Sequence, residues 1–313
     1  MSNVFEDIIK QQGLIILDGA LATELEARGA NLNHSLWSAK LLMENPELIK
    51  QVQLDYLKAG ANIISTATYQ ASFEGFEKHG YTRTETTQLM KMSVLIAEAA
   101  RRDFQMSYGK NINQVILIAA SIGPYGASLA DGSEYHGQYG VTIGDLIEFH
   151  KDRLAVLVNT NADILAFETI PCLDEAMAIK KLISLYPTKK AWVSFSCQDG
   201  QRLSSGELFA DAVKLLQDAN EVIGIGVNCT APRHIESLVQ IAKPITNKTI
   251  MVYPNKGETY DPITKSWETK LNNNNHFIND ARKWLAAGAF AIGGCCRTSP
   301  EDIKQLEALI KTR

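Results

Sequence analysis

Short apolar runs rich in β-branched residues recur along the chain, and longer segments with helical periodicity separate them. Most of the runs are continuously apolar, which is typical of parallel strands that helices cover on both faces. We predict eight strands, over Leu14–Leu17, Asn62–Thr66, Val115–Ala120, Asp163–Phe167, Ala191–Phe195, Val222–Val227, Ile250–Tyr253 and Phe290–Ile292.

The segments between these runs carry recognisable helix starts. Asn45 before Pro46 is typical of an N-cap followed by proline at the first helical position. Thr142 with Asp145 three residues later indicates a variant of the capping box. Strands that alternate with helices favour a (β/α)₈ barrel of the TIM type, with an open doubly wound sheet as the alternative. We expect one domain over all 313 residues, with a core from about residue 14 to residue 310.

Three long polar segments follow predicted strands. They are Gly123–Gly140 after the third strand, Gln198–Gly206 after the fifth and Asn255–His276 after the seventh. Loops of this length in a compact domain usually serve a site or are mobile. All three leave the carboxyl ends of their strands, where the active sites of such barrels lie. We therefore expect the function at that end.

Composition and charge narrow the choice of partners. With 45% hydrophobic residues and a formal net charge of -4, the chain can build a large core and gives no reason to expect a nucleic-acid partner. We expect no membrane partner, because the longest apolar runs are far shorter than the ~20 residues of a spanning helix. Glu6 and Asp7 do not suit a secretory signal, so we predict a cytoplasmic protein. Five cysteines without regular spacing do not indicate a disulfide framework.

Three of the cysteines stand where predicted strands end. Cys229 follows the sixth strand, and Gly293-Gly294-Cys295-Cys296 follows the eighth. In a closed barrel only one strand separates these two, so the three sulfurs can meet on one rim. Three thiolates leave one tetrahedral position of a zinc ion open, and the two glycines give the backbone freedom to aim adjacent side chains. Spacing alone leaves a metal site, a redox pair and simple packing about equally open.

Other polar or sulfur-bearing positions have ordinary structural explanations. Asp18 could cap the helix that follows the first strand, and Glu168 could pair with a neighbouring base, although an acid that ends an apolar run more often faces a site. Cys172 and Cys197 are expected to be small buried hydrophobes. The histidines, at positions 34, 79, 136, 150, 234 and 276, have no metal-like spacing.

Six motifs occur in order along the chain. They are Leu17-Asp18-Gly19-Ala20 with Thr23-Glu24-Leu25, Thr66-Ala67-Thr68-Tyr69-Gln70, Ser121-Ile122-Gly123-Pro124-Tyr125-Gly126, Phe167-Glu168-Thr169, Gly226-Val227-Asn228-Cys229 and Gly293-Gly294-Cys295-Cys296-Arg297. Singly, only the last two are specific, but in this order they are jointly very specific. From about Leu14 to Ile310 the chain resembles the zinc-dependent homocysteine S-methyltransferase family. The run Ala130–Tyr135 adds to a likeness with its short single-domain branch, which uses S-methylmethionine.

The resemblance implies a (β/α)₈ barrel with a zinc ion held by Cys229, Cys295 and Cys296. It also implies that Asp18 and Glu168 contact the amino group of homocysteine. Zinc would deprotonate the homocysteine thiol, which would take a methyl group from a sulfonium donor to give methionine. S-methylmethionine is the first candidate donor and S-adenosylmethionine the second.

Several assignments stay open at this point. Asn228 is a candidate substrate contact, and Tyr69, Tyr125 and Trp37 are candidates to hold the sulfonium by cation–π attraction. A betaine-type or other onium methyltransferase is an alternative, less favoured because betaine-using relatives have a tyrosine where this chain has Thr169. The sequence is also compatible with a redox protein that forms a vicinal disulfide, and with a non-catalytic protein that holds structural zinc. The oligomeric state is open, and a monomer suits the sequence.

Overall fold

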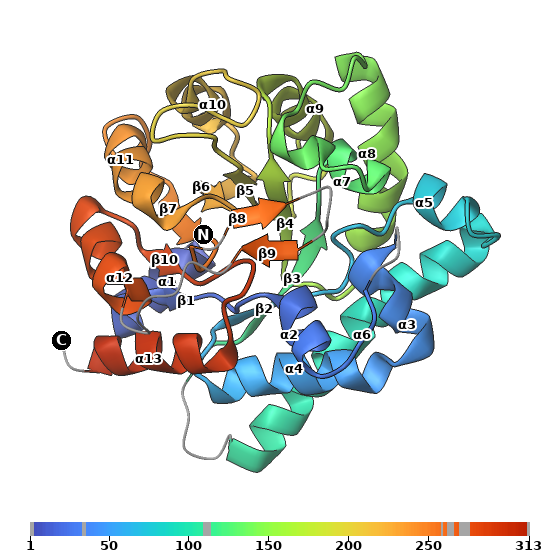
Figure 1. Ribbon diagram of the computed structural model, residues 1–313, viewed down its shortest axis with the longest axis horizontal. Coiled ribbons are helices and arrows are strands. Elements are labelled where there is room, and N and C mark those ends of the chain that lie inside the picture. The colour runs from blue at the N-terminus through green and yellow to red at the C-terminus, as the bar shows by residue number, and fades with distance from the viewer. Residues whose placement is uncertain are drawn as a thin grey trace.

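Eight parallel strands form a closed ring at the centre of the molecule (Figure 1). The structure is a computed structural model, which describes residues 3–32, 36–108, 114–257, 259–261, 266–268 and 276–311. In their order around the sheet, the strands are β1 (Ile15–Ile16), β10 (Ala291–Ile292), β7 (Thr249–Tyr253), β6 (Val222–Asn228), β5 (Ala191–Phe195), β4 (Ile164–Ile170), β3 (Leu117–Ile122) and β2 (Ile63–Ser65). Leu17 pairs in parallel with Ile63 and thereby joins β1 to β2. The predicted (β/α)₈ barrel is confirmed.

Helices surround this ring, and the two that follow Asn45 and Thr142 begin where the sequence indicates. The longer ones are α4 (Pro46–Lys58), α6 (Arg83–Tyr108), α8 (Ile143–Leu157), α9 (Leu173–Ile183), α10 (Phe209–Leu216), α11 (Pro232–Ala242), α12 (His276–Ala287) and α13 (Pro300–Lys311). Shorter ones are α2 (Leu21–Ala27), η1 (Trp37–Lys40), α3 (Leu41–Glu44) and α5 (Phe73–Glu77). Asn45 caps α4, and Thr142 with Asp145 forms the predicted capping box of α8. Among the described residues, no helix is long and apolar enough to cross a membrane.

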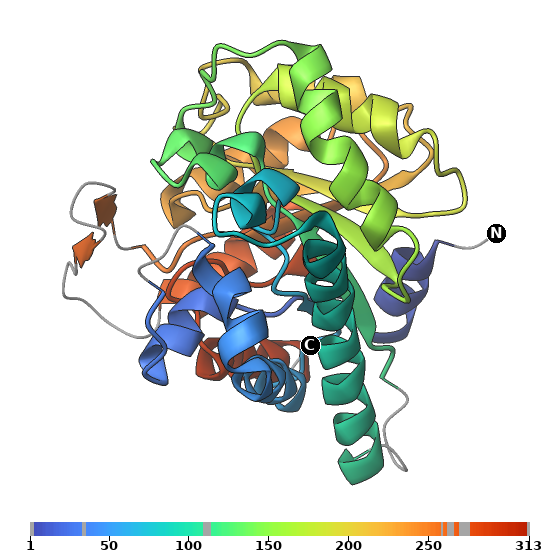
Figure 2. The same cartoon turned by 90° about the vertical axis from the view of Figure 1, so that its right-hand side faces the viewer.

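The amino-terminal end of the barrel is closed by a helix that the strand pattern did not reveal, α1 (Val4–Gln12). Its Phe5 and Ile8 are buried among the side chains that fill the barrel, and the Phe5 ring centroid lies 6.3 Å from that of Trp192 on β5. The other face of the sheet packs beneath the helices in a second, larger core. Figure 2 shows α1 and the β8–β9 pair at opposite ends of the molecule. A cavity can therefore open only at the carboxyl ends of the strands.

The segments at that carboxyl end differ in part from the predicted loops. Strand β3 continues to Ile122 rather than Ala120, and β4 continues to Ile170 rather than Phe167. Their last residues include polar side chains that face the barrel interior, so the apolar run stops before the strand does. Gly123–Gly140 contains α7 (Tyr125–Leu129) and η3 (Ser133–Tyr135), and β8 (Thr259–Asp261) pairs antiparallel with β9 (Ser266–Glu268).

Candidate active site

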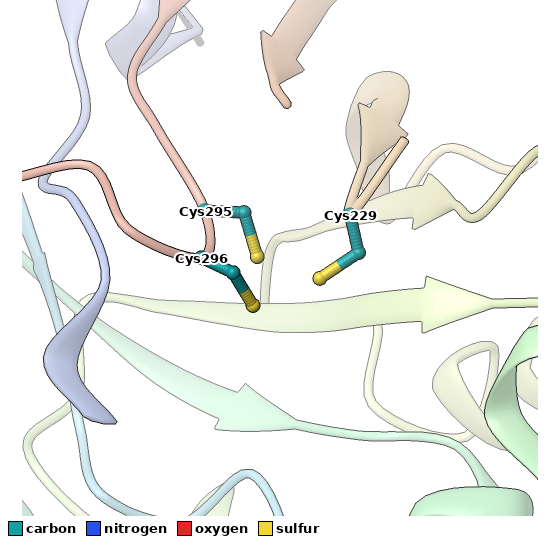
Figure 3. Close-up of side chains that lie close together, drawn as sticks. All are labelled: Cys229, Cys295 and Cys296. Carbon is teal, nitrogen blue, oxygen red and sulfur yellow. The ribbon is translucent and has the colours of Figure 1, made fainter. Parts of the chain in front are cut away.

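Three cysteine thiols lie together at the carboxyl ends of β6 and β10, with only β7 between these strands (Figure 3). Cys229 follows β6, and Cys295 and Cys296 follow β10. Their Sγ atoms all lie within 4.8 Å of one another, and the Cys229 side chain points toward the other two. Three soft sulfur donors this close suit a thiophilic metal that keeps one tetrahedral position open. The structure thus brings the predicted trio together, and its donor chemistry fits a metal ion.

The chain reaches this arrangement through close backbone packing after β10. A Cβ atom on Gly293 would lie 2.5 Å from Cβ of Leu17, and one on Gly294 would lie 2.2 Å from the Thr298 side chain. Neither glycine has a positive φ, so the reason expected from the sequence, conformational freedom, is wrong; the glycines are needed for close approach. Cys229 itself has a φ of 46°, a strained conformation of the kind found at functional sites.

The three thiols share hydrogen bonds, and their acidities are linked. Hydrogen bonds with Cys229 and Cys296 lower the pKa of Cys295 well below the ordinary thiol value. The hydrogen bond with Cys295, followed by the one with Cys296, raises the pKa of Cys229 well above it. The hydrogen bonds thus favour the deprotonated form of Cys295 and the protonated form of Cys229. A coordinated cation favours the deprotonated form of every thiol that binds it.

Asp18 lies at the end of β1 and faces the cavity in front of the thiols. Its Oδ2 accepts a hydrogen bond of 2.7 Å from the Ser65 backbone N–H, and its Oδ1 accepts one of 3.2 Å from the Ser65 hydroxyl. The N-cap of α2 is Ala20, which has no side-chain capping bond, so the capping alternative for Asp18 is wrong. Burial, only partly offset by the Ser65 bonds, raises the pKa of Asp18 to about 7.

Glu168 lies within β4 and faces the same cavity. It accepts hydrogen bonds from the hydroxyls of Ser121 and Tyr253, and in the described part of the chain it has no ion pair with a lysine or arginine. Burial raises its pKa to about 8, and the nearby charge of Asp18 adds to the shift. Two buried carboxylates close enough to influence each other are a pattern that a positively charged ligand stabilises.

Asn228, the last residue of β6, lines the cavity, but its amide group is hydrogen-bonded to the protein. Its Oδ1 accepts hydrogen bonds from the Thr169 N–H at 2.7 Å and the Ser194 hydroxyl at 2.8 Å, and its Nδ2 donates to the Thr169 hydroxyl at 2.8 Å. Thr169 has a φ of 60°, which is unfavourable for a β-branched residue. Asn228 therefore holds the residue after Glu168 in a strained backbone conformation beside the thiols.

The two aromatic candidates whose side chains the structure describes fall in different places. Tyr69 lines the cavity. Tyr125 is not among the cavity-lining residues; its ring packs against Tyr139 and Phe149, with centroids 5.2 and 5.1 Å away. The side chain of Trp37 lies outside the described residues.

A cavity of about 260 Å³ connects these groups. Its lining includes all three cysteines, Asp18, Glu168, Asn228 and Tyr69. It also includes residues that the sequence did not identify as substrate contacts, namely Gln70, Glu134, Tyr135, Trp192 and Tyr253. Trp192 and Ser194 alternate along β5 toward the interior, and both hydrogen-bond the Tyr253 hydroxyl. This two-residue alternation was the available signal for the interior residues.

Two cysteines lie apart from the trio. Cys172 and Cys197 are 6% and 8% exposed, so the prediction that they are buried is confirmed. Burial raises the pKa of the Cys172 thiol to about 12 and keeps it protonated. Among the described residues, the trio is the one group of three histidines, cysteines or carboxylates close enough to share a metal ion.

The fold and the thiol cluster together define a (β/α)₈ barrel with a candidate metal centre at its catalytic end. A family model described as homocysteine S-methyltransferase matches residues 15–310. Homocysteine S-methyltransferase YbgG of Bacillus subtilis is 49% identical over 98% of this chain and 97% of its own length. Selenocysteine Se-methyltransferase of Brassica oleracea var. italica is 44% identical over 98% of this chain and 92% of its own. The chain belongs to the homocysteine S-methyltransferase family and is a methyltransferase.

A solved structure agrees with this assignment across the whole barrel. The crystal structure of the homocysteine methyltransferase MmuM from Escherichia coli, in its metallated form, superposes with a TM-score of 0.88. The two are 40% identical, and the match covers 98% of this chain and 100% of that one. A metal has thus been seen in a relative that shares nearly the full length of this chain.

Proposed function

We propose that this protein transfers a methyl group from a sulfonium donor to the thiol of homocysteine, giving methionine, with zinc held by Cys229, Cys295 and Cys296. The observation that carries the proposal is the meeting of three thiols within 4.8 Å at the wall of a cavity that two buried carboxylates also line. Sulfur ligands suit zinc, and the carboxylates suit an amino acid substrate.

Cys229, Cys295 and Cys296 would hold the zinc ion, which would supply the Lewis-acid chemistry that keeps a substrate thiol in its nucleophilic thiolate form. A free thiol has a pKa near ~8.5 and is mostly protonated at neutral pH. Each unit by which this pKa falls favours the thiolate over the thiol by about 1.36 kcal/mol.

Asp18 and Glu168 hold the amino group of homocysteine in this proposal. Their pKa values of about 7 and about 8 reflect burial that disfavours negative charge. An ammonium group between them supplies the missing positive charge and keeps both ionised. Ser65 and the Ser121–Tyr253 pair fix the two carboxylates before the substrate arrives. Such preorganisation lowers the entropic cost of placing the thiol beside the three cysteines.

During transfer, the acceptor sulfur forms a bond to the methyl carbon while the S–CH₃ bond of the donor breaks. The electron pair of that bond stays on the donor sulfur, so the sulfonium becomes a neutral thioether. The leaving group is neutral and needs no proton, which agrees with the lack of a described histidine in the cavity lining. Two opposite charges disappear in this step, so a cavity from which water is excluded favours it. The rings of Tyr69 and Tyr135 on the wall can face the sulfonium.

S-methylmethionine is the donor we propose first, and S-adenosylmethionine second. Thr169 presents a small side chain, turned toward Asn228, where betaine-using relatives carry a tyrosine. A cytoplasmic location suits the site, because thiols stay reduced there. We further propose that the chain works as one domain, because every strand of its single barrel contributes to the ring around the cavity.

The test combines a metal assay with a panel of methyl donors. Purified protein should carry about one zinc per chain, and homocysteine with S-methylmethionine should yield methionine. The panel should include S-adenosylmethionine, betaine and a selenol acceptor, the last because a relative is named for selenocysteine. If betaine were the one donor in the panel that gave methionine, the donor assignment would be wrong. If the purified protein carried no metal, the zinc assignment would be wrong.

A matched pair of cysteine variants locates the metal. Cys295→Ser should lose zinc and nearly all activity, because a serine hydroxyl is a poor ligand for a soft site. Cys172→Ser is the control, since Cys172 lies outside the trio at the N-cap of α9, where serine is tolerated. Full zinc content and full activity in Cys295→Ser would refute the proposed centre.

A further inference from the structure

The described side chains that line the cavity carry charge of one sign only. The lining contains Asp18, Glu26, Asp131, Glu134 and Glu168, and none of its described residues is a lysine, arginine or histidine. Homocysteine is a zwitterion without net charge, so Asp18 and Glu168 suffice for its one ammonium group. The remaining acids point to a second ligand that brings positive charge of its own.

Glu134 has an acceptor that no described residue of the protein satisfies. It belongs to η3, in the segment between β3 and α8, and its Oε2 is buried without a hydrogen-bond partner among the described residues. Burial raises the pKa of Glu134 to about 7, which shows how poorly its charge is compensated. A buried carboxylate oxygen left without a donor is costly, so such groups commonly await a ligand.

Gln70 has a second such acceptor on the neighbouring segment. Its Nε2 donates to the carbonyl of Ala127 in α7 over 2.9 Å, which leaves Oε1 as the free end of the amide. This Oε1 is likewise buried and has no partner in the described part of the chain. The amide is therefore held with its oxygen available and its nitrogen used.

Gln70 and Glu134 flank the same short helix. Gln70 binds α7 at Ala127, and Gly126 lies so close to η3 that a Cβ on it would be 2.5 Å from the Glu134 nitrogen. Gln70 and Glu134 line the same cavity as the three thiols. Both residues thus line the cavity from segments separate from β1 and β4, and each has a buried oxygen without a partner among the described residues.

We propose that Glu134 and Gln70 bind the α-ammonium group of the methyl donor and so select a sulfonium amino acid over simpler onium compounds. A primary ammonium has three N–H donors, enough for both orphan oxygens, and its charge matches the carboxylate. Betaine has a quaternary nitrogen without N–H groups and leaves both oxygens unsatisfied. The inference rests on the proposed function, since it assigns the second substrate of the same reaction.

The test compares S-methylmethionine with its deaminated analogue, γ-(dimethylsulfonio)butyrate, in wild type and Glu134→Gln. The variant should raise KM for S-methylmethionine at least about tenfold, as expected for loss of a charge-assisted hydrogen bond. Its KM for homocysteine, its zinc content and its kcat at saturating donor should stay within about threefold of wild type. The variant should not raise the KM of the analogue. The preference for S-methylmethionine over the analogue should shrink accordingly.

Two further variants guard against other causes. Gln70→Met removes the second acceptor without changing charge and should shift the same KM in the same direction. Glu148→Gln removes one carboxylate from the outer face of α8, where Glu148 is exposed, and should leave both substrates unaffected. It thereby controls for a general effect of net charge.

The outcomes separate this inference from the proposed function. No methyl transfer from any sulfonium by wild type would overturn the function itself. Normal wild-type transfer with an unchanged donor KM in Glu134→Gln and Gln70→Met would overturn only the inference. A rise in the homocysteine KM, or an equal rise for donor and analogue, would overturn it too, because Glu134 would then serve the acceptor or the sulfonium.

Discussion

His150 on α8 sits in a fully buried row with Arg153 and Glu175, and the pH dependence of folding should report its state. The Arg153 guanidinium donates to Nδ1 of His150 at 2.7 Å, so the ring proton is on Nε2 and is donated to Glu175 at 2.7 Å. Arg153 also donates to the Gly123 carbonyl, and Glu175 accepts from the Tyr125 N–H at 2.6 Å. The row thereby fixes the start of the segment that carries Glu134.

Burial, and next the positive charge of Arg153, lower the pKa of His150 from its ordinary 6.5 to about 4. Between these values the unfolded chain binds a proton that the folded chain does not, so stability is lost as the pH falls through this window. The full loss, reached below pH 4, is about 3 kcal/mol at about 1.36 kcal/mol per pH unit. At pH 5 the same linkage relation gives a loss of about 2 kcal/mol.

The measurement is the free energy of unfolding in urea, at pH 8 and pH 5, for wild type and His150→Gln. Glutamine can donate to Glu175 and accept from Arg153 but has no group that titrates. Wild type should lose about 2 kcal/mol more than the variant between the two pH values. The raised carboxyl pKa values of Asp18 and Glu168 act in the opposite direction, but equally in both chains. Equal losses in the two proteins would refute the assignment of a neutral buried His150.

Three further substitutions test the packing behind the site, one of them as a control. Gly226→Ala should destabilise the protein by more than about 3 kcal/mol, because its Cβ would lie 1.9 Å from the Met251 carbonyl on β7. Gly144→Ala lies in the open first turn of α8 and should be neutral or stabilising by up to about 1 kcal/mol. Similar urea midpoints for Gly226→Ala and Gly144→Ala would contradict this expected difference. Asn228→Ala removes the hydrogen bonds that hold Thr169 in its strained conformation. This variant should retain zinc, but it should lose about 1–3 kcal/mol of folding stability and at least about tenfold in the initial rate of methyl transfer. An unchanged rate of methyl transfer in this variant would show that Asn228 does not position the active site.

The barrel could be predicted because most of its strands are buried on both faces and so form largely apolar runs. Helix α1 could not be predicted in this way. This helix is stabilised by contacts such as that of Phe5 with Trp192. The two residues lie far apart in the sequence, and their contact forms only when the ring of strands is closed. The ends of β3 and β4 were also missed, because their last residues face a polar cavity and break the pattern that marks a strand.

The candidate site divides along a similar line. Cys229 and Cys295 are in the sequence at strand ends, and parallel strands in a closed barrel bring strand ends to one rim, so topology alone sufficed to place them together. Glu134 stands in a segment rich in glycine and serine, where an acid is ordinarily solvated. Its burial follows from the packing of η3 against α7 at Gly126, which no local pattern encodes.

The one-signed charge of the cavity also bears on turnover. On the proposed function, S-methylmethionine enters with a net charge of +1 and leaves as methionine with none, because transfer removes the sulfonium charge. The carboxylates therefore attract the donor more strongly than the product derived from it. The product still has an ammonium group that can donate to the unpartnered oxygen of Glu134. It no longer has the sulfonium charge that the carboxylates attract. Binding energy that vanishes with the reaction favours product release.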